Sequence, residues 1–185
     1  MAEYYFMSQL PSLDGIDDHM SLPITEERFL ELCHRFLGKK AQREMEKLSL
    51  MPPRVRENSG SALIETWNEG ERNLRLALAK VRAEKMKKPF DIESKNISPE
   101  LLKTVHTAVD MENPLEAEYF LNRHRLNFLE SIRPMDIFSE ESVFYYGLKL
   151  KLLSRMRRFD AEIGKALYKK NYDLIMNGER LEATK

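Results

Sequence analysis

Histidine and carboxylate side chains at helical spacing are the first residues of this chain that could do chemistry. Glu31 and His34 are three residues apart, which is the Glu-x-x-His spacing of a di-iron site in a helical bundle. Such a site needs a second pair on another helix, but His19, His106 and His124 have no glutamate three residues before them. One such pair is expected by chance, so the pattern does not favour a metal site.

Two further combinations would suit nucleophilic or zinc chemistry. Cys33 and His34 are neighbours on one predicted helix, so their side chains point about 100° apart, a poor arrangement for a thiolate–imidazole pair. A small buried hydrophobic residue is the better interpretation of Cys33. His106 and Asp110 share a helix face that His124 could join after folding, but a zinc site needs three or four ligands. A surface polar contact is therefore favoured here.

The motifs that bind phosphate or calcium are incomplete or absent. No Gly-x-x-x-x-Gly-Lys-Ser/Thr sequence occurs, and the seven glycines do not cluster. Residues 14–18 resemble part of a calcium loop but lack the closing glutamate, which favours a polar turn. We therefore predict a protein that is not an enzyme, with no catalytic, cofactor-binding or metal-binding residues.

Composition narrows the class of partner. The 185 residues are 42% hydrophobic, which argues for a buried core, and 30 basic residues balance 30 acidic ones. General nucleic-acid binders usually carry a basic excess. Two clusters of basic residues are nevertheless present. Three interpretations of them stay open: a solvated face, a protein-contact face and, least favoured, a nucleic-acid contact. The clusters comprise Lys80, Arg82, Lys85, Lys87 and Lys88, and then Lys149, Lys151, Arg155, Arg157 and Arg158.

The cellular compartment is predicted from the cysteine content, the first residues and the lengths of the apolar runs. Cys33 is the only cysteine, so no intrachain disulfide can form, and a reducing compartment fits best. The first residues do not read as a signal peptide, and no run approaches the ~18 apolar residues that cross a bilayer. We expect a soluble cytoplasmic protein.

The elements that position these residues are predicted to be helices. Caps, prolines and apolar periodicity place them at 25–47 with an interruption near Gly38, 61–88, 98–109, 113–133 and 139–178. The aromatic run at 4–11 is interpreted as an extended or single-turn segment packed on the helices. Residues 48–60, with Pro52 and Pro53, cannot continue a helix and mark a hinge.

The predicted fold is therefore all-α, an elongated helical bundle with a long C-terminal helix. Its divisions are an N-terminal segment and helix at 1–50, a Pro/Ser/Gly linker at 51–60 and the main bundle at 61–185, sharing one core. The last helix, if unbroken, is longer than the domain needs and would offer a docking surface, although Gly147 and Gly164 could bend it instead.

Three stretches of the chain carry motifs that can be compared with known families. They are residues 2–11, with an aromatic run before Leu-Pro; residues 65–79, with an acidic and asparagine-rich turn; and residues 144–155 followed by 159–165, with a Leu-x-Leu helix and then Asp-x-Glu-x-Gly. Together they resemble a little-characterised bacterial family associated with V-type (A/V-type) ATP synthases, whose members are similar to the central-axis subunit called C or d. Members of this family are generally longer, and the resemblance implies that the linker at 48–60 stands where a longer member would have a further lobe.

The resemblance implies a non-catalytic adaptor between the rotor shaft and the membrane ring. Its partners would be protein subunits of the rotary synthase, with peripheral attachment at the inner face of the cell membrane through them. The alternative function is a helical nucleic-acid-associated protein using residues 149–158. The candidate partner-binding residues on the two helical stretches are Glu65, Asn68, Asn73, Arg75, Tyr145, Tyr146, Lys149 and Arg155.

Overall fold

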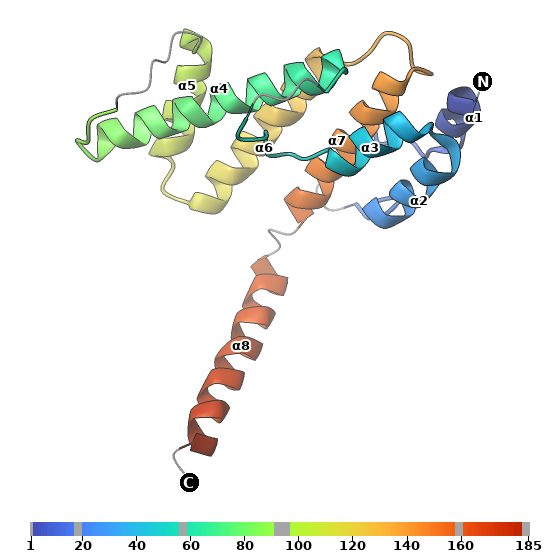
Figure 1. The fold of residues 1–185 in the computed structure, drawn as a ribbon. Coiled ribbons are helices and arrows are strands. Elements are labelled where there is room, and N and C mark those ends of the chain that lie inside the picture. The colour runs from blue at the N-terminus through green and yellow to red at the C-terminus, as the bar shows by residue number, and fades with distance from the viewer. Residues whose placement is uncertain (1, 17–19, 56–58, 91–96, 158–160, 183–185) are drawn as a thin grey trace.

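A computed structural model of the chain describes residues 2–16, 20–55, 59–90, 97–157 and 161–182. These residues form eight helices and no strand, so the predicted all-α class is confirmed. The helices are α1 (Ala2–Gln9), α2 (Glu26–Phe36), α3 (Lys39–Lys47), α4 (Ala62–Lys85), α5 (Pro99–Asp110), α6 (Pro114–Ser131), α7 (Glu140–Arg157) and α8 (Ala161–Glu182). Figure 1 shows α1 to α7 in one bundle, with α8 outside it.

Local capping chemistry begins the helices where the sequence predicts. Thr25, Ser61 and Ser98 each accept a hydrogen bond from the backbone amide three residues ahead, and these bonds begin α2, α4 and α5. Asn113 caps α6 in the same way, through the amide of Leu115. Gly38 separates α2 from α3, as its helix-breaking character predicts.

The prediction of an extended or single-turn segment at residues 4–11 is wrong. Residues 2–9 form the helix α1, which is too short to be stable alone. Its Phe6 is fully buried and stacks on Phe29 and Phe36 of α2, with ring centroids 6.2 and 5.6 Å apart. Tertiary burial of Phe6 therefore stabilises a helix that local sequence does not predict.

The core has two parts joined by α4 and α6. The larger part contains buried side chains of α1, α2, α3, α7 and the first half of α4, and the smaller one lies between α5, the second half of α4 and α6. Residues before the linker thus share a core with residues after it, because Phe29 and Met45 pack in the same cluster as Trp67 and Leu148.

Helix α7 is the central helix of the larger core. Most of its side chains are buried, on all sides of the helix, which is the pattern of a helix surrounded by others. Gly147 at its middle permits the close approach of α2 and α3, because a Cβ there would lie 3.0 Å from Leu48 and 3.2 Å from both Phe29 and Met45.

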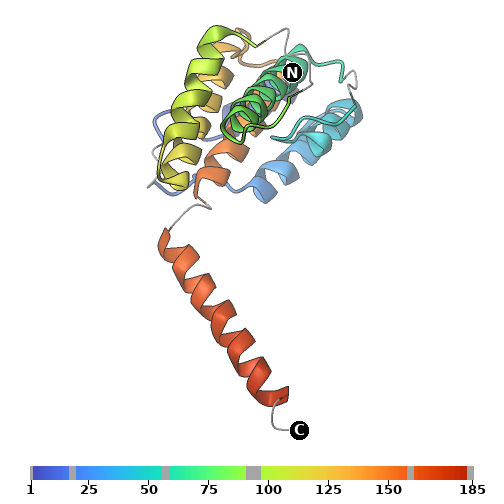
Figure 2. The ribbon, with the colours of Figure 1, turned by 90° about the vertical axis from the view of Figure 1, so that its left-hand side faces the viewer.

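The predicted long C-terminal helix is two helices in the structure, α7 and α8. The residues between them, 158–160, lie outside the described residues, and these include Arg158 of the basic cluster and the first two residues of the stretch 159–165. His19, and Asp17 and Asp18 of the predicted polar turn, also lie outside the described residues. Gly147 and Gly164 lie inside helices and end neither of them. Figures 1 and 2, which differ by a 90° rotation, both show α8 extending away from the bundle.

Candidate functional site

Three of the reactive side chains identified in the sequence, those of Glu31, Cys33 and His34, are paired or buried. Glu31 accepts a hydrogen bond from Arg28 at 2.8 Å, and His34 lies 3.5 Å from Glu46. Cys33 is buried, and this burial raises the pKa of its thiol to about 12, so it stays protonated at neutral pH. Within the described ranges, no three His, Cys, Asp or Glu side chains are grouped as a metal site would require.

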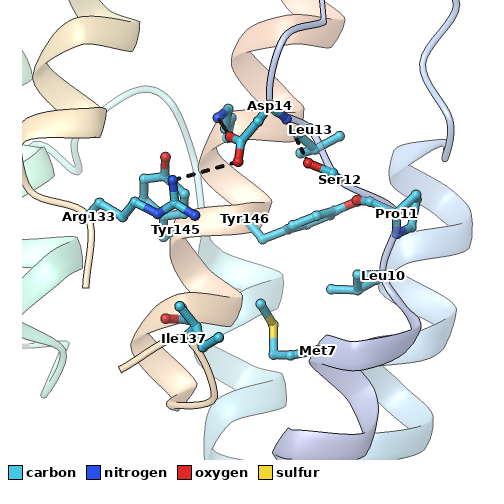
Figure 3. A pocket seen from close by; sticks show the side chains of 12 residues that line it. Met7, Leu10, Pro11, Ser12, Leu13, Asp14, Arg133, Ile137, Tyr145 and Tyr146 are labelled. Carbon is cyan, nitrogen blue, oxygen red and sulfur yellow. Dashed lines mark hydrogen bonds and ion pairs between the residues drawn. The ribbon is translucent and has the colours of Figure 1, made fainter. Parts of the chain in front are cut away.

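A cavity of about 150 Å³ lies between α7 and the segment that follows α1. Figure 3 shows its lining, with apolar side chains at one end and charged ones at the other. The apolar lining side chains are Met7, Leu10, Pro11, Leu13, Ile137 and the rings of Tyr145 and Tyr146, of which Leu13 lies beside Asp14 at the charged end. The polar lining side chains are Ser12, Asp14, Arg133, Ser142 and Lys149.

Two tyrosines of α7 fix the walls of this cavity. The Tyr146 hydroxyl donates a hydrogen bond of 2.9 Å to the carbonyl oxygen of Pro11, which holds the N-terminal segment against α7. The neighbouring Tyr145 ring has Arg133 and Lys149 5.6 and 5.8 Å from its centroid, within the range of cation–π attraction. Burial raises the pKa of both hydroxyls, so both remain neutral.

The charged end of the cavity is centred on Lys149. Its ammonium group donates hydrogen bonds to Asp14 at 2.5 Å and to Glu130 at 2.6 Å. The hydrogen bond from Lys149 lowers the pKa of Asp14, and nearby Arg133 acts in the same direction. Burial acts to raise the pKa of Glu130, but the hydrogen bonds and the charge of Lys149 outweigh it, so that pKa is lowered as well.

The lowered pKa values of Asp14 and Glu130 predict how the free energy of unfolding depends on pH. A carboxyl whose pKa is lower in the folded state contributes stability above its unfolded pKa, about 4, and loses it as pH falls through the folded value. Replacing Lys149 with methionine removes the largest lowering contribution to the pKa of both carboxyls. We therefore expect the variant to lose less stability than the wild type as the pH falls below about 4, measured by denaturant unfolding across a pH series.

The exposed lysine variant Lys103→Met on α5 is the control, and it should keep the wild-type pH dependence. Equal pH dependence in the Lys149 variant and the wild type would mean that Lys149 does not stabilise these two carboxylates.

The cavity could accommodate an apolar side chain of a partner protein, with a polar or charged residue of the same partner next to it. Ile137 at its rim is 50% exposed, and Met7 and Leu10 are partly buried beside it. Asp14 and Arg133 remain partly exposed at the charged end and lie 3.7 Å apart. A partner could bury one apolar residue here and place a charge near Asp14 or Arg133, as compact interface pockets commonly do.

The structure brings together three of the eight predicted partner-binding residues. Tyr145, Tyr146 and Lys149 line this cavity, and each is largely buried, so a partner would reach only their edges. Arg155, further along α7, has its guanidinium 3.3 Å from Glu118 of α6.

The four predicted residues of α4 do not converge. Glu65 is exposed, and Arg75 donates a hydrogen bond to Glu71 at 2.9 Å. Asn68 lines a hollow beside the linker and Asn73 lines another beside α5 and α6. Their role in binding a partner stays a prediction.

Three cations of the basic cluster on α7 are paired with acidic residues from other segments. In addition to Lys149, the Lys151 ammonium lies 3.3 Å from Glu26 of α2, and Arg155 pairs with Glu118. The charge of each of these three cations is therefore partly neutralised before any phosphate could approach. This pairing weakens the nucleic-acid interpretation of residues 149–158.

The sequence did not single out Glu130, Arg133 or Ile137, and it interpreted Asp14 only as part of a polar turn. Asp14 and Lys149 are 135 residues apart, so no local pattern links them. The nearest signal was Lys149 itself, a cation predicted within an apolar helix, which needs an acidic partner when it is buried.

Comparisons with known proteins give no further assignment. No family model matches the chain, no curated protein matches it and no solved structure matches it. None of the helices in the described part of the chain is both long enough and apolar enough to span a membrane.

Proposed function

We propose that this chain is a non-catalytic accessory or adaptor subunit of a V-type ATP synthase. In this proposal it docks rotor and membrane-ring parts, contributes to ion transport only through the assembled complex, and meets the membrane only through its partner subunits. The family assignment rests on the resemblance of residues 2–11, 65–79, and 144–155 with 159–165.

One observation carries the proposal of a docking role. Residues 2–11 and 144–155, which resemble the same family, both line one cavity although the contacting residues Pro11 and Tyr146 are 135 positions apart in sequence. The hydrogen bond from Tyr146 to Pro11 joins them directly. Shared motifs that meet at a partly open cavity support a common binding role better than motifs scattered over the fold.

The residues of the second stretch, 65–79, stabilise the fold and do not line the cavity. Trp67 packs against Phe128, with ring centroids 6.2 Å apart, and α4 packs on α7. This stretch therefore holds α7 in the position that the cavity needs.

The test is affinity capture of the tagged full chain from membranes of its source cells. We expect rotor or ring subunits of the synthase to be captured, and Ile137→Glu at the cavity rim to reduce their capture by about tenfold or more, as loss of an interface hot spot does. A charge at this rim position opposes insertion of an apolar side chain.

Met135→Glu is the matched control, because Met135 is fully exposed two residues away and does not line the cavity. It should capture the same subunits as the wild type. If the wild type captures only proteins unrelated to the synthase, the assignment is wrong. If both variants capture equally, the cavity is not the docking site.

A further inference from the structure

The hollow beside α5 and α6 is a second cavity, with a volume of about 440 Å³. Residues of α4, α5 and α6 line it, and these three helices pack on one another (Figure 1). It shares no lining residue with the cavity beside α7. Its volume lies within the range of sites that bind small molecules, whereas the volume of about 150 Å³ beside α7 suits a single side chain.

One wall of this second cavity is aromatic. Trp67 of α4 and Phe128 of α6 line it, with ring centroids 6.2 Å apart. Gly70 permits this arrangement, because a Cβ at that position would overlap the Phe128 ring. Leu74 and Leu101 add apolar surface. Such a lining favours a flat aromatic ligand, which can pack against the two rings.

The charges that line this cavity are compensated or exposed to water. Glu71 is buried, and it accepts hydrogen bonds from Arg125 at 2.9 and 3.1 Å and from Arg75 at 2.9 Å. Glu100 is exposed on the first turn of α5. Burial and the charge of Arg125 lower the pKa of His124, so this imidazole is neutral at neutral pH. An ionic ligand would lose its hydration here without gaining a free counter-charge, so the cavity favours a neutral ligand.

Hydrogen-bond donors outnumber acceptors around the buried part of this cavity. The indole Nε1 of Trp67 and the amide Nδ2 of Asn122 are buried and have no acceptor among the described residues. Asn122 lies against the lining residue Arg125, because its Oδ1 accepts a hydrogen bond of 3.1 Å from the guanidinium. A guanidinium also has more N–H donors than the three that Arg125 uses on Glu71 and Asn122. The complementary ligand therefore carries acceptors, such as carbonyl oxygens or ring nitrogens.

We propose that this cavity binds a neutral heteroaromatic molecule of nucleobase or nucleoside size. Its ring lies against Trp67 and Phe128, and its acceptors face Arg125. Asn73 and His124, both half-buried, line the cavity as well and can hydrogen-bond the edge of the ring, because an amide and a neutral imidazole each donate and accept. This inference does not depend on the proposed function, because it concerns a different cavity.

The first test is equilibrium dialysis of the full chain against adenosine, inosine and uridine, which differ in the acceptors that their bases carry. We expect at least one of them to bind with a dissociation constant below about 1 mM. Trp67 is the only tryptophan, so its fluorescence reports on this cavity. The emission of Trp67 should change saturably, with the same dissociation constant.

Substitutions of the two half-buried lining residues test the location of the site. His124→Ala and Asn73→Ala should each weaken binding by about tenfold or more. His106→Ala and Asn127→Ala are the matched controls, because both residues are exposed and neither lines the cavity. The controls should bind as the wild type does. Asn73→Ala keeps the test valid if His124→Ala does not fold.

A phosphate group on the ligand should weaken binding. The 5′-monophosphate of the nucleoside that binds best brings negative charge to a cavity lined by Glu100, so we expect its affinity to be lower by about tenfold or more. Three results would overturn the proposal. They are no binding of any of the three nucleosides at concentrations up to about 1 mM, binding that neither changes Trp67 emission nor responds to the two cavity variants, and tighter binding of the monophosphate than of the nucleoside.

Discussion

Replacing Glu71 with leucine is expected to lower the free energy of unfolding by about 3–5 kcal/mol. Glu71 is 2% exposed and accepts two hydrogen bonds from Arg125, at 2.9 and 3.1 Å, between the two parts of the core. Arg125 is itself buried and would keep its charge with only Asn122 as a polar partner at 3.1 Å. Urea unfolding of the two proteins measures the difference.

The reason for this large effect is an uncompensated buried charge, so removing both charges should reverse it. We expect Glu71→Leu combined with Arg125→Met to return to within about 1 kcal/mol of the wild type or above it. Arg75 also binds Glu71 but is 38% exposed, so Arg75→Met should cost about 1 kcal/mol or less. If the double variant is as unstable as Glu71→Leu alone, the loss arises from packing and the charge argument is wrong.

Truncating Trp67 to alanine is expected to cost about 3–5 kcal/mol. Trp67 is 1% exposed and is among the largest fully buried side chains of the described residues. Its ring packs on Phe128 in the larger core, and alanine would leave a cavity between α4 and α6 that the close-packed helices cannot fill. The measurement is again urea unfolding, followed by circular dichroism because the variant lacks the only tryptophan.

Trp67→Phe is the matched control for this prediction. The indole Nε1 of Trp67 has no acceptor among the described residues, so phenylalanine removes a buried donor that makes no hydrogen bond. We expect this variant to lose clearly less stability than Trp67→Ala. Equal losses in the two variants would contradict the cavity argument, because both lack the indole nitrogen and they differ only in the ring that fills the core.

Local chemistry explains which helices the sequence predicts correctly. Thr25, Ser61, Ser98 and Asn113 each satisfy a backbone amide that the first turn of a helix leaves open, and this needs only residues within three positions. The predicted helices therefore begin at the observed residues. Their C-terminal ends differ by a few residues, as at α4, which is predicted to reach 88 and ends at Lys85.

The helix α1 shows where local reasoning fails. Nothing in residues 2–9 caps or favours a helix strongly, and Pro11 prevents a longer one. The helix exists because Phe6 reaches the rings of Phe29 and Phe36, more than 20 residues later in the chain. A contact of this kind cannot be identified from the residues of one segment.

The candidate cavity was predicted only in part, for a similar reason. Tyr145, Tyr146 and Lys149 were selected because they stand together in one apolar helix, but they were expected at a contact surface and are largely buried. Asp14 and Arg133 complete the cavity from two distant places in the chain, and Glu130, one turn before Arg133, pairs with Lys149. With 30 acidic residues available, the sequence could not identify which of them pairs with Lys149.

By itself the sequence determined the helical class, the starts of the capped helices, the burial of Cys33 and the break at Gly38, because periodicity and capping act over a few residues. Only the tertiary structure decided that Glu71 pairs with Arg125, that Lys149 pairs with Asp14, and that α7 is enclosed while α8 is exposed. These outcomes depend on which faces meet across 50 or more residues, and many pairings of apolar stripes and charges are compatible with one sequence until the helices are packed.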